Sequence, residues 1–263
     1  MAKIGSKTIT HIYQGSNLIT DDSSNTKDIK LGNKSVNFVY QGNNILHPNP
    51  IEDGLILWYD FKGMKNNDVS KGVAGDLSGN GNDGILNNFA FTSESGYSDG
   101  LKFDGVDDYY ISNSKIQRTS KELTISISVN VVEKSTNWQY FLNLVDNDGK
   151  IISVLQHWGN PDLFLNDLTI NGHNYFSSSL TKYNITITVN GKNIKVFING
   201  TSGTVSNTTA NVDISTFTNE LKIVKPSNIK LNGTIYSIKM YDRVLTDQEI
   251  QHNYQLEKER WNL

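Results

Sequence analysis

The chain of 263 residues contains no cysteine, only four prolines and no strong excess of one charge. The absence of cysteine excludes disulfide frameworks, iron–sulfur clusters and thiolate zinc sites. Acidic side chains (27) slightly outnumber basic ones (24), so no broad basic surface is available for phosphates, and we expect no nucleic-acid binding. No apolar run approaches the roughly 18 residues that a transmembrane helix needs, so we expect no membrane insertion.

A secretory signal is also missing. Residues 1–13 contain two lysines, but they include neither an apolar core segment nor a cleavage site of small residues. We therefore expect the chain to be synthesised in a cytoplasm without a signal peptide.

Catalytic motifs are missing as well. A retaining glycosidase needs two carboxylates that flank one bond, and the only glutamates close in sequence, Glu257 and Glu259, fall in a predicted helix. Asp107 and Asp108 are adjacent, so in a strand they would point to opposite faces and share no substrate. The sequence has no histidine pair with zinc spacing, no GxSxG motif and no glycine-rich phosphate loop. We predict that the protein is not an enzyme and uses no organic cofactor.

The first 46 residues contain a tandem repeat. Residues 3–19 align with residues 30–46 at an offset of 27 residues, with seven identities in 17 positions. The identical pairs are Lys3/Lys30, Gly5/Gly32, Lys7/Lys34, Tyr13/Tyr40, Gln14/Gln41, Gly15/Gly42 and Asn17/Asn44. Each copy predicts a β-hairpin that turns at its Gln-Gly dipeptide. Because a lone hairpin is marginally stable in water, we expect residues 1–46 to form a docking or assembly arm; the alternative is a subdomain packed on the main domain.

A proline-rich linker is expected at residues 47–52, which hold two of the four prolines, Pro48 and Pro50. We place the main domain at residues 53–263. Apart from its end, this region has the period-two pattern of strands, and Asn190-Gly191 joins two alternating segments as a hairpin turn. The predicted strands are 55–61, 101–103, 109–112, 123–131, 140–145, 151–155, 163–170, 185–189, 194–198, 221–224 and 235–241. The pattern indicates an all-β fold with two antiparallel sheets packed as a sandwich.

One C-terminal helix is predicted at residues 246–260. Thr246 and Glu249 have the spacing of a capping box, which marks a helix start. Ile250, Tyr254 and Trp261 fall on roughly one face, and we expect this face to pack against the sandwich.

Four segments occur in a characteristic order: GLILWYDF at 54–61, DLSGNGNDG at 76–84, GLKFDGVDDY at 100–109 and GTIYSIKMYDRVLT at 233–246. From about residue 53 to residue 260, the chain resembles laminin-G-like, concanavalin A-like lectin/glucanase domains. The resemblance implies a jelly-roll sandwich, a binding role instead of catalysis and often a structural calcium ion.

The ending, residues 235–261, is similar to the version found in structural proteins of phages of Gram-positive bacteria, and the (I/V)YQG hairpins look like N-terminal segments of the same proteins. This resemblance implies a bacteriophage virion protein of the tail, baseplate or fibre that binds host cell-surface polysaccharide. Released by lysis, a virion protein needs no export signal. We expect residues 1–46 to bind other virion proteins and the chain to be a homo-oligomer. The alternatives are a purely structural head decoration or cement protein, or an auxiliary carbohydrate-binding module.

A calcium site is predicted around the loop 76–84, which offers oxygen ligands at alternate positions. The candidate ligands are Asp60, Asp76, Asn80, Asn82 and Asp108, with Asp104 and Asp107 as further possibilities. Where the family commonly has an acidic residue in the last strand, this chain has Tyr236, which should share a strand face with Ile238 and Met240. The alternative is that these Asp and Asn side chains only cap turns.

A glycan site is predicted where aromatic and polar residues adjoin near strand ends. The candidate residues are Trp138, Tyr140, His157 and Trp158. Sugar recognition uses aromatic faces beside amide and carboxylate groups, whereas the alternative is that these tryptophans are simply buried.

Overall fold

The computed structural model describes residues 50–131, 139–157, 160–165, 168–171, 181–191, 193–203, 217–226 and 231–263. For the short strands before residue 50 and for the strand residues within 156–171, it describes the backbone but not the side chains. The chain divides into two compact units, Met1–Pro50 and Ile51–Leu263. The division falls after Pro50, inside the segment 47–52.

The first unit consists of two-stranded antiparallel pairs that follow the sequence repeat. Its strands are β1 (Lys3–Ile4), β2 (Lys7–Thr8), β3 (His11–Gln14), β4 (Asn17–Asp21), β5 (Lys30–Leu31), β6 (Lys34–Ser35), β7 (Val39–Gln41) and β8 (Asn44–His47). Each sequence copy forms two hairpins, where the sequence predicted one. The pairs β3–β4 and β7–β8 carry a register irregularity before Tyr13 and before Tyr40, which are equivalent positions of the repeat.

In the second unit, a large antiparallel sheet forms the middle layer. It has the order β12-β13-β25-β16-β21-β22-β23, and β9 also pairs with β25. The strands are β9 (Leu55–Asp60), β12 (Gly96–Tyr97), β13 (Leu101–Asp104), β16 (Glu122–Val131), β21 (Lys182–Asn190), β22 (Asn193–Ile198), β23 (Thr201–Ser202) and β25 (Asn232–Tyr241).

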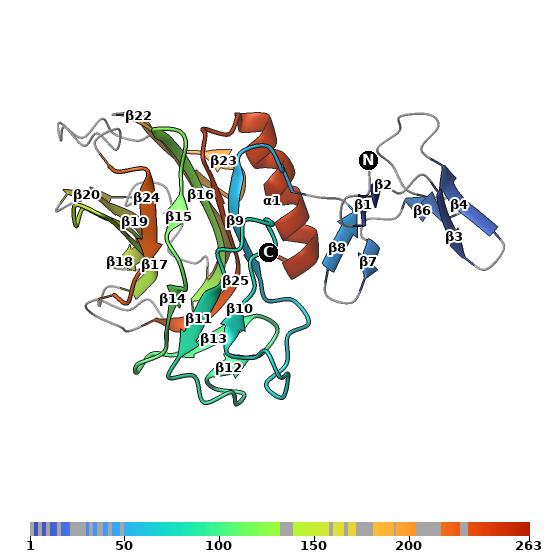
Figure 1. The fold of residues 1–263 in the computed structure, drawn as a ribbon, viewed down its shortest axis with the longest axis horizontal. Helices are drawn as coiled ribbons and strands as arrows, with labels where there is room; N and C mark the ends of the chain where they lie inside the picture. Colours follow the sequence, from blue (N-terminus) through green and yellow to red (C-terminus); the bar gives the residue numbers. More distant parts are fainter. Residues whose placement is uncertain are drawn as a thin grey trace. The chain divides into compact units, whose positions relative to one another are not determined.

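A second sheet packs on one face of this middle layer, and a helix covers the other face (Figure 1). The second sheet has the order β15-β24-β17-β18-β19-β20, and three further strands form the small sheet β10-β11-β14. Their bounds are β10 (Val73–Ala74), β11 (Gly84–Asn87), β14 (Tyr109–Ser112), β15 (Ile116–Gln117), β17 (Gln139–Asp146), β18 (Ile151–His157), β19 (Asn160–Leu165), β20 (Leu168–Asn171) and β24 (Glu220–Ile223). This arrangement confirms the predicted antiparallel jelly-roll sandwich.

Alternation along the strands builds the core between the two sheets. On β16, Leu123, Ile125 and Ile127 are at most 1% exposed and belong to one continuous apolar cluster. The hairpin β21–β22 has the register that its pattern predicts, with Ile187 opposite Val196 and the turn at Asn190. The predicted strand 163–170 is wrong in one respect: it is divided between β19 and β20, which pair with each other. The Asn-Asp dipeptide between them is typical of turns.

The helix α1 (Asp247–Trp261) begins directly after the predicted N-cap, Thr246, so each bound lies one residue beyond the predicted helix 246–260. Thr246 is its N-cap, and the reciprocal hydrogen bonds with Glu249 complete the capping box. Ile250, Tyr254 and Trp261 are buried, as the sequence predicts. Among the described residues, no helix has the length and apolar character that crossing a bilayer requires.

A polar layer lies between α1 and the middle sheet. The outward side chains in the middle of β16, Thr124, Ser126 and Ser128, are buried, and Ser128 contacts Glu257 of α1. The carboxylate of Glu257 on α1 is 4% exposed and pairs with the ammonium group of Lys239 on β25. It also accepts hydrogen bonds from the hydroxyl groups of Ser128, at 2.7 Å, and Ser237. The helix is therefore held by charge and hydrogen bonds as well as by apolar contact.

The position of Tyr236 corrects one prediction. A β-bulge in the pairing of β16 with β25 leaves Tyr236 without an opposing residue. Ile235, Ile238 and Met240 point into the core, whereas the ring of Tyr236 stacks on Trp261 of α1 with 4.8 Å between centroids. Because a bulge reverses the alternation locally, Tyr236 does not share a face with Ile238 and Met240.

Candidate binding and metal sites

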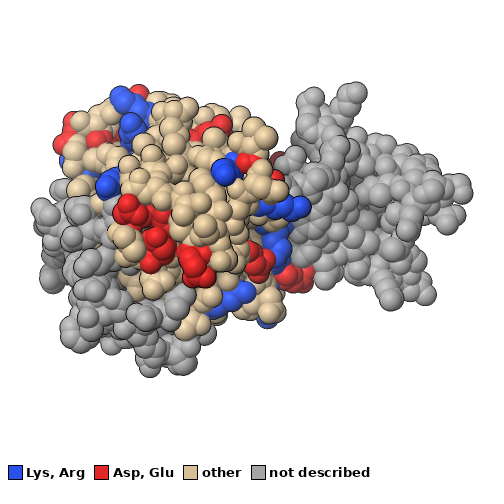
Figure 2. Space-filling model, turned by 90° about the horizontal axis from the view of Figure 1, so that it is seen from below, with Lys and Arg blue, Asp and Glu red and all other residues tan. Residues whose placement is uncertain are grey.

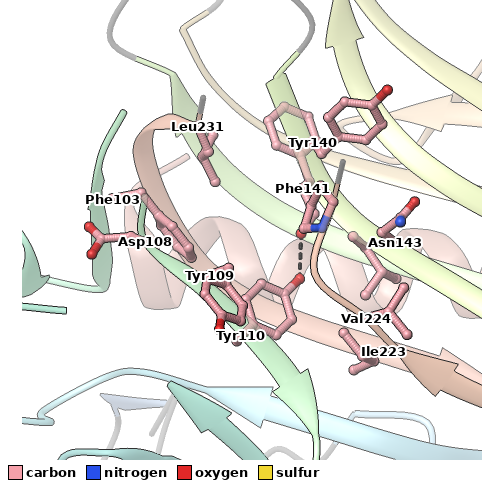
Figure 3. A pocket seen from close by; sticks show the side chains of 12 residues that line it. Phe103, Asp108, Tyr109, Tyr110, Tyr140, Phe141, Asn143, Ile223, Val224 and Leu231 are labelled. Atoms are coloured by element: carbon pink, nitrogen blue, oxygen red, sulfur yellow. Dashed lines mark hydrogen bonds between the residues drawn. The ribbon is translucent and has the colours of Figure 1, made fainter. Parts of the chain in front are cut away.

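A small pocket opens where β14 approaches β17 and β24 (Figure 3). The space that water centres can occupy in it is about 20 Å³, which is room for one ordered water. Its lining is largely aromatic and apolar: Phe103, Asp108, Tyr109, Tyr110, Tyr140, Phe141, Leu142, Asn143, Ile223, Val224, Pro226 and Leu231. A pocket of this size does not enclose a sugar ring.

Hydrogen bonds hold the three strands around the pocket together. The hydroxyl group of Tyr110 donates to the main-chain carbonyl of Phe141, which joins β14 to β17. The amide of Val224, after β24, donates to the carbonyl of Asn143 at 3.0 Å. Burial raises the pKa of Tyr110 well above its ordinary value, so this hydroxyl group stays a donor at every physiological pH.

Three tyrosines, Tyr109, Tyr110 and Tyr140, line the pocket. Tyr140 is half-buried, and burial raises its pKa. The ammonium group of Lys225 lies 4.7 Å from the ring centroid of Tyr109, within the range of a cation–π contact. Sequence reasoning identified Tyr140 but missed Tyr109 and Lys225, because β24 is far from both tyrosines in the sequence. The available signal was the pair of tyrosines that follows FDGVDD.

Of the other predicted glycan residues, Trp138 and Trp158 lie outside the described residues. The backbone of His157 ends β18, and its side chain also lies outside the description. The prediction of a glycan site at these residues stays a prediction.

Three aspartates cluster in the turn between β13 and β14. Ligand oxygens of Asp104, Asp107 and Asp108 all lie within 4.8 Å of one another. The expectation that Asp107 and Asp108 point to opposite faces is therefore wrong, because both precede β14 and lie in a turn in which Gly105 has a φ of +79°. Figure 2 views this end of the second unit and shows acidic side chains gathered on it.

Asp108 is the buried member of this cluster. Its carboxylate accepts hydrogen bonds from the hydroxyl group of Ser95 at 2.9 Å and the amide of Asp104 at 3.0 Å. Burial raises the pKa of Asp108, and the nearby charges of Asp104 and Asp107 add to the increase. A hard cation bound by carboxylate oxygens would relieve this repulsion.

The five predicted calcium ligands do not converge on one point. The carboxylate of Asp60 forms a two-point salt bridge with the guanidinium group of Arg260 on α1, with Oδ2–Nε and Oδ1–Nη2 distances of 2.7 and 2.8 Å. Both side chains are at most 2% exposed. Asp108 belongs to the other cluster, in the turn after β13.

The remaining three predicted ligands, Asp76, Asn80 and Asn82, tie the loop 76–84 to β9. The Asp76 carboxylate accepts from the amide of Trp58 at 2.9 Å, the amide of Asn82 at 2.9 Å, and the amide and hydroxyl group of Ser78. The side-chain amides of Asn80 and Asn82 donate to main-chain carbonyls of β9. These contacts are those of turn-capping side chains, which was the alternative reading of the loop; calcium binding stays a prediction.

The glutamates of α1 are not placed as a catalytic pair. Glu257 is buried against Lys239, whereas Glu259 is exposed on another side of the helix. This geometry does not put two carboxylates on either side of one glycosidic bond.

Comparisons with known proteins agree with this architecture. Similar solved structures include Trypanosoma rangeli sialidase, with 14% identity, a TM-score of 0.54, and coverage of 86% of this chain and 36% of that chain. The binding domain of botulinum neurotoxin serotype D has 16% identity, a TM-score of 0.53, and coverage of 79% and 52%. The receptor binding domain of botulinum neurotoxin mosaic serotype C/D has 16% identity, a TM-score of 0.55, and coverage of 78% and 51%.

The chain thus spans between a third and about half of the length of these proteins, and the likeness at such identity concerns the fold. Among curated proteins, the comparison finds no match. Residues 104–251, more than half of the chain, match the sequence profile of the concanavalin A-like lectin/glucanases superfamily. The matched segment contains most strands of both sandwich sheets and the start of α1, and on this evidence the chain belongs to that superfamily.

Proposed function

We propose that the protein is a bacteriophage virion structural protein of the tail, baseplate or fibre, and that its sandwich domain binds host cell-surface polysaccharide. Residues 1–46 dock the chain to other virion proteins, and the protein acts as a homo-oligomer. The lectin-type fold supports the binding role, and the sequence resemblance to structural proteins of phages of Gram-positive bacteria supports the virion role.

The observation that carries the binding role is the aromatic mouth of the pocket. Tyr140 lines it from β17, and Tyr109 lines it from β14. Protein sites use aromatic rings to bind a sugar, because the apolar face of the ring packs against the C–H groups of the sugar.

The binding role is tested by a pull-down with purified host cell walls and by a glycan array, both with the full chain. We expect Tyr140→Ala to lose binding and Tyr140→Phe, which keeps the ring, to retain most of it. Melting temperatures of both variants check that the fold is intact. Binding by Tyr140→Ala at the level of the unchanged protein would remove this pocket from consideration.

The virion role is tested by electron microscopy of purified particles labelled with an antibody against the chain. We expect label at the tail, baseplate or fibre. Particles without label would contradict the virion assignment, whatever the outcome of the glycan experiments.

A second candidate is a head decoration or cement protein without a ligand. The size of the pocket favours it, because about 20 Å³ is too small to enclose a sugar. A particle reconstruction with density on the capsid, together with a glycan array on which nothing binds, would select this function.

A further inference from the structure

The strand β9 lies at an edge of the middle sheet. It pairs with β25 on one side, and no strand of the described chain pairs with its other side. The main-chain groups of such an edge can hydrogen-bond an extended segment of another chain. The sequence of β9 is LILWYD, which combines high β-propensity with a single charge at its end. A segment of this composition pairs with copies of itself when its edge is open.

The loop 76–84, which leads from β10 into β11, covers this edge at Trp58. The amide of Trp58 donates to the carboxylate of Asp76 at 2.9 Å, and its carbonyl accepts from the amide of Leu77 at 2.8 Å. In an antiparallel ladder, a residue exchanges both of its main-chain groups with the residue opposite. Asp76 and Leu77 therefore take the place that a residue of a neighbouring strand would occupy.

Two side-chain amides extend this row of contacts along β9. Asn82 donates to the carbonyl of Ile56 at 2.8 Å, and Asn80 donates to the carbonyl of Leu55 at 3.0 Å. Ile56 lies two residues before Trp58, so its carbonyl points to the same side of the strand. The loop thus supplies one acceptor for an amide and three donors for carbonyls, which is the kind of set that a paired strand supplies.

Further hydrogen bonds fix the shape of the loop. The second carboxylate oxygen of Asp76 accepts from the amide of Asn82 at 2.9 Å, and the amide of Asp76 donates to the carboxylate of Asp83 at 2.8 Å. The hydroxyl group of Tyr59 on β9 donates to the carbonyl of Asn82 at 2.6 Å. These contacts hold the groups that face β9 in position before any other chain approaches.

We propose that the loop 76–84 is an edge cap that prevents β9 from pairing with β9 of a second copy of this chain. Two copies of one strand pair antiparallel about a two-fold axis, so each copy presents the same edge to the other and the contact is self-complementary. The proposal concerns self-association and does not depend on the proposed binding and virion roles.

The experiment compares the unchanged full chain with the variant Asn80→Ala/Asn82→Ala, which removes two donors of the cap. The matched control is Asn67→Ala/Asn113→Ala, which removes two exposed amides outside the loop. Light scattering measures the mass in solution over a range of protein concentrations, with a chelator present so that no metal ion supports the loop. Hydrogen exchange of the peptide that contains β9 reports whether this strand is covered, and the melting temperature checks the fold.

At low concentration, we expect the β9 peptide of the test variant to exchange about fivefold to tenfold faster than in the unchanged protein, because the loop leaves the edge more often. As the concentration rises, the mass should increase at least about twofold over that of the unchanged protein, and exchange in β9 should slow again. The control variant should match the unchanged protein at every concentration.

Two results would overturn the proposal. One is a folded test variant whose mass equals that of the unchanged protein at every concentration. The other is association without slower exchange in β9, because the copies would then join through another surface. If the double variant does not fold, Asn80→Ala alone, which removes an exposed side chain, is judged by the same two criteria.

Discussion

The buried ion pair between Asp60 and Arg260 allows a quantitative prediction. It joins the end of β9 to the last turn of α1, and the two side chains are 1% and 2% exposed. Replacing Arg260 with methionine keeps the apolar stem but leaves the Asp60 carboxylate buried with only the amide of Lys62, at 2.9 Å, as a donor. Breaking a buried pair in this way costs about 3–5 kcal/mol. We expect the urea midpoint of the Arg260→Met variant to fall by roughly 1–2 M.

The pH dependence of this loss has a definite sign. Burial already raises the pKa of Asp60, and removal of the guanidinium group raises it further. A carboxyl group with a raised pKa in the folded state binds protons more readily there than in the unfolded chain. The free energy of unfolding of the variant therefore rises as the pH falls through this raised pKa, and its deficit relative to the unchanged protein shrinks.

The assay is urea unfolding at neutral pH and at about pH 4.5, close to the ordinary carboxyl pKa, followed by fluorescence. The double variant Asp60→Asn/Arg260→Met removes both charges and should recover at least half of the lost stability. A loss below about 1 kcal/mol in Arg260→Met, or the same deficit at both pH values, would refute the reasoning.

Three further predictions concern the pocket, the aspartate cluster and the first unit. Tyr110→Phe leaves the buried carbonyl of Phe141 without its donor, so thermal unfolding should show a loss of about 1–3 kcal/mol. Titration of millimolar calcium into the chelator-treated protein should release heat and raise its melting temperature, and Asp107→Asn should abolish both effects. If the unchanged protein shows neither heat nor a shift in melting temperature, the aspartate cluster does not bind calcium. Residues 51–263 alone should melt within about 3 °C of the full chain, because they contain the large apolar cluster of the described residues, and they should fail to enter particles; normal incorporation would contradict the docking role.

Regular strands and the helix were predictable from the sequence because their signals are local. The alternation around Asn190 determined the register of β21 and β22, and the spacing of Thr246 and Glu249 located the start of α1. In the second unit, five short strands, β10, β11, β12, β15 and β23, were not predicted. They have two to four residues each and depend on a neighbouring strand more than on their own pattern.

The site was less predictable because it depends on contacts between distant segments. Asp60 was a reasonable calcium ligand in sequence, but its partner Arg260 is 200 residues away. The β-bulge at Tyr236 turned its side chain to the face of the sheet opposite Ile238, and the local sequence pattern does not predict such a bulge. The pocket combines Tyr109, Tyr140 and Val224 from three strands, so only the assembled sandwich brings them together.

The polar layer under α1 affects how readily the protein aggregates during folding, before the helix has docked on the sheet. An apolar sheet face that waits for its covering helix is adhesive, and newly made copies at high concentration would stick to one another through it. The face of β16 and β25 that receives α1 carries Ser128, Ser237 and Lys239 beside the ring of Tyr236, so it is less adhesive than a wholly apolar face would be. The sandwich can thus close before the helix docks while the uncovered face exposes few apolar side chains of β16 and β25.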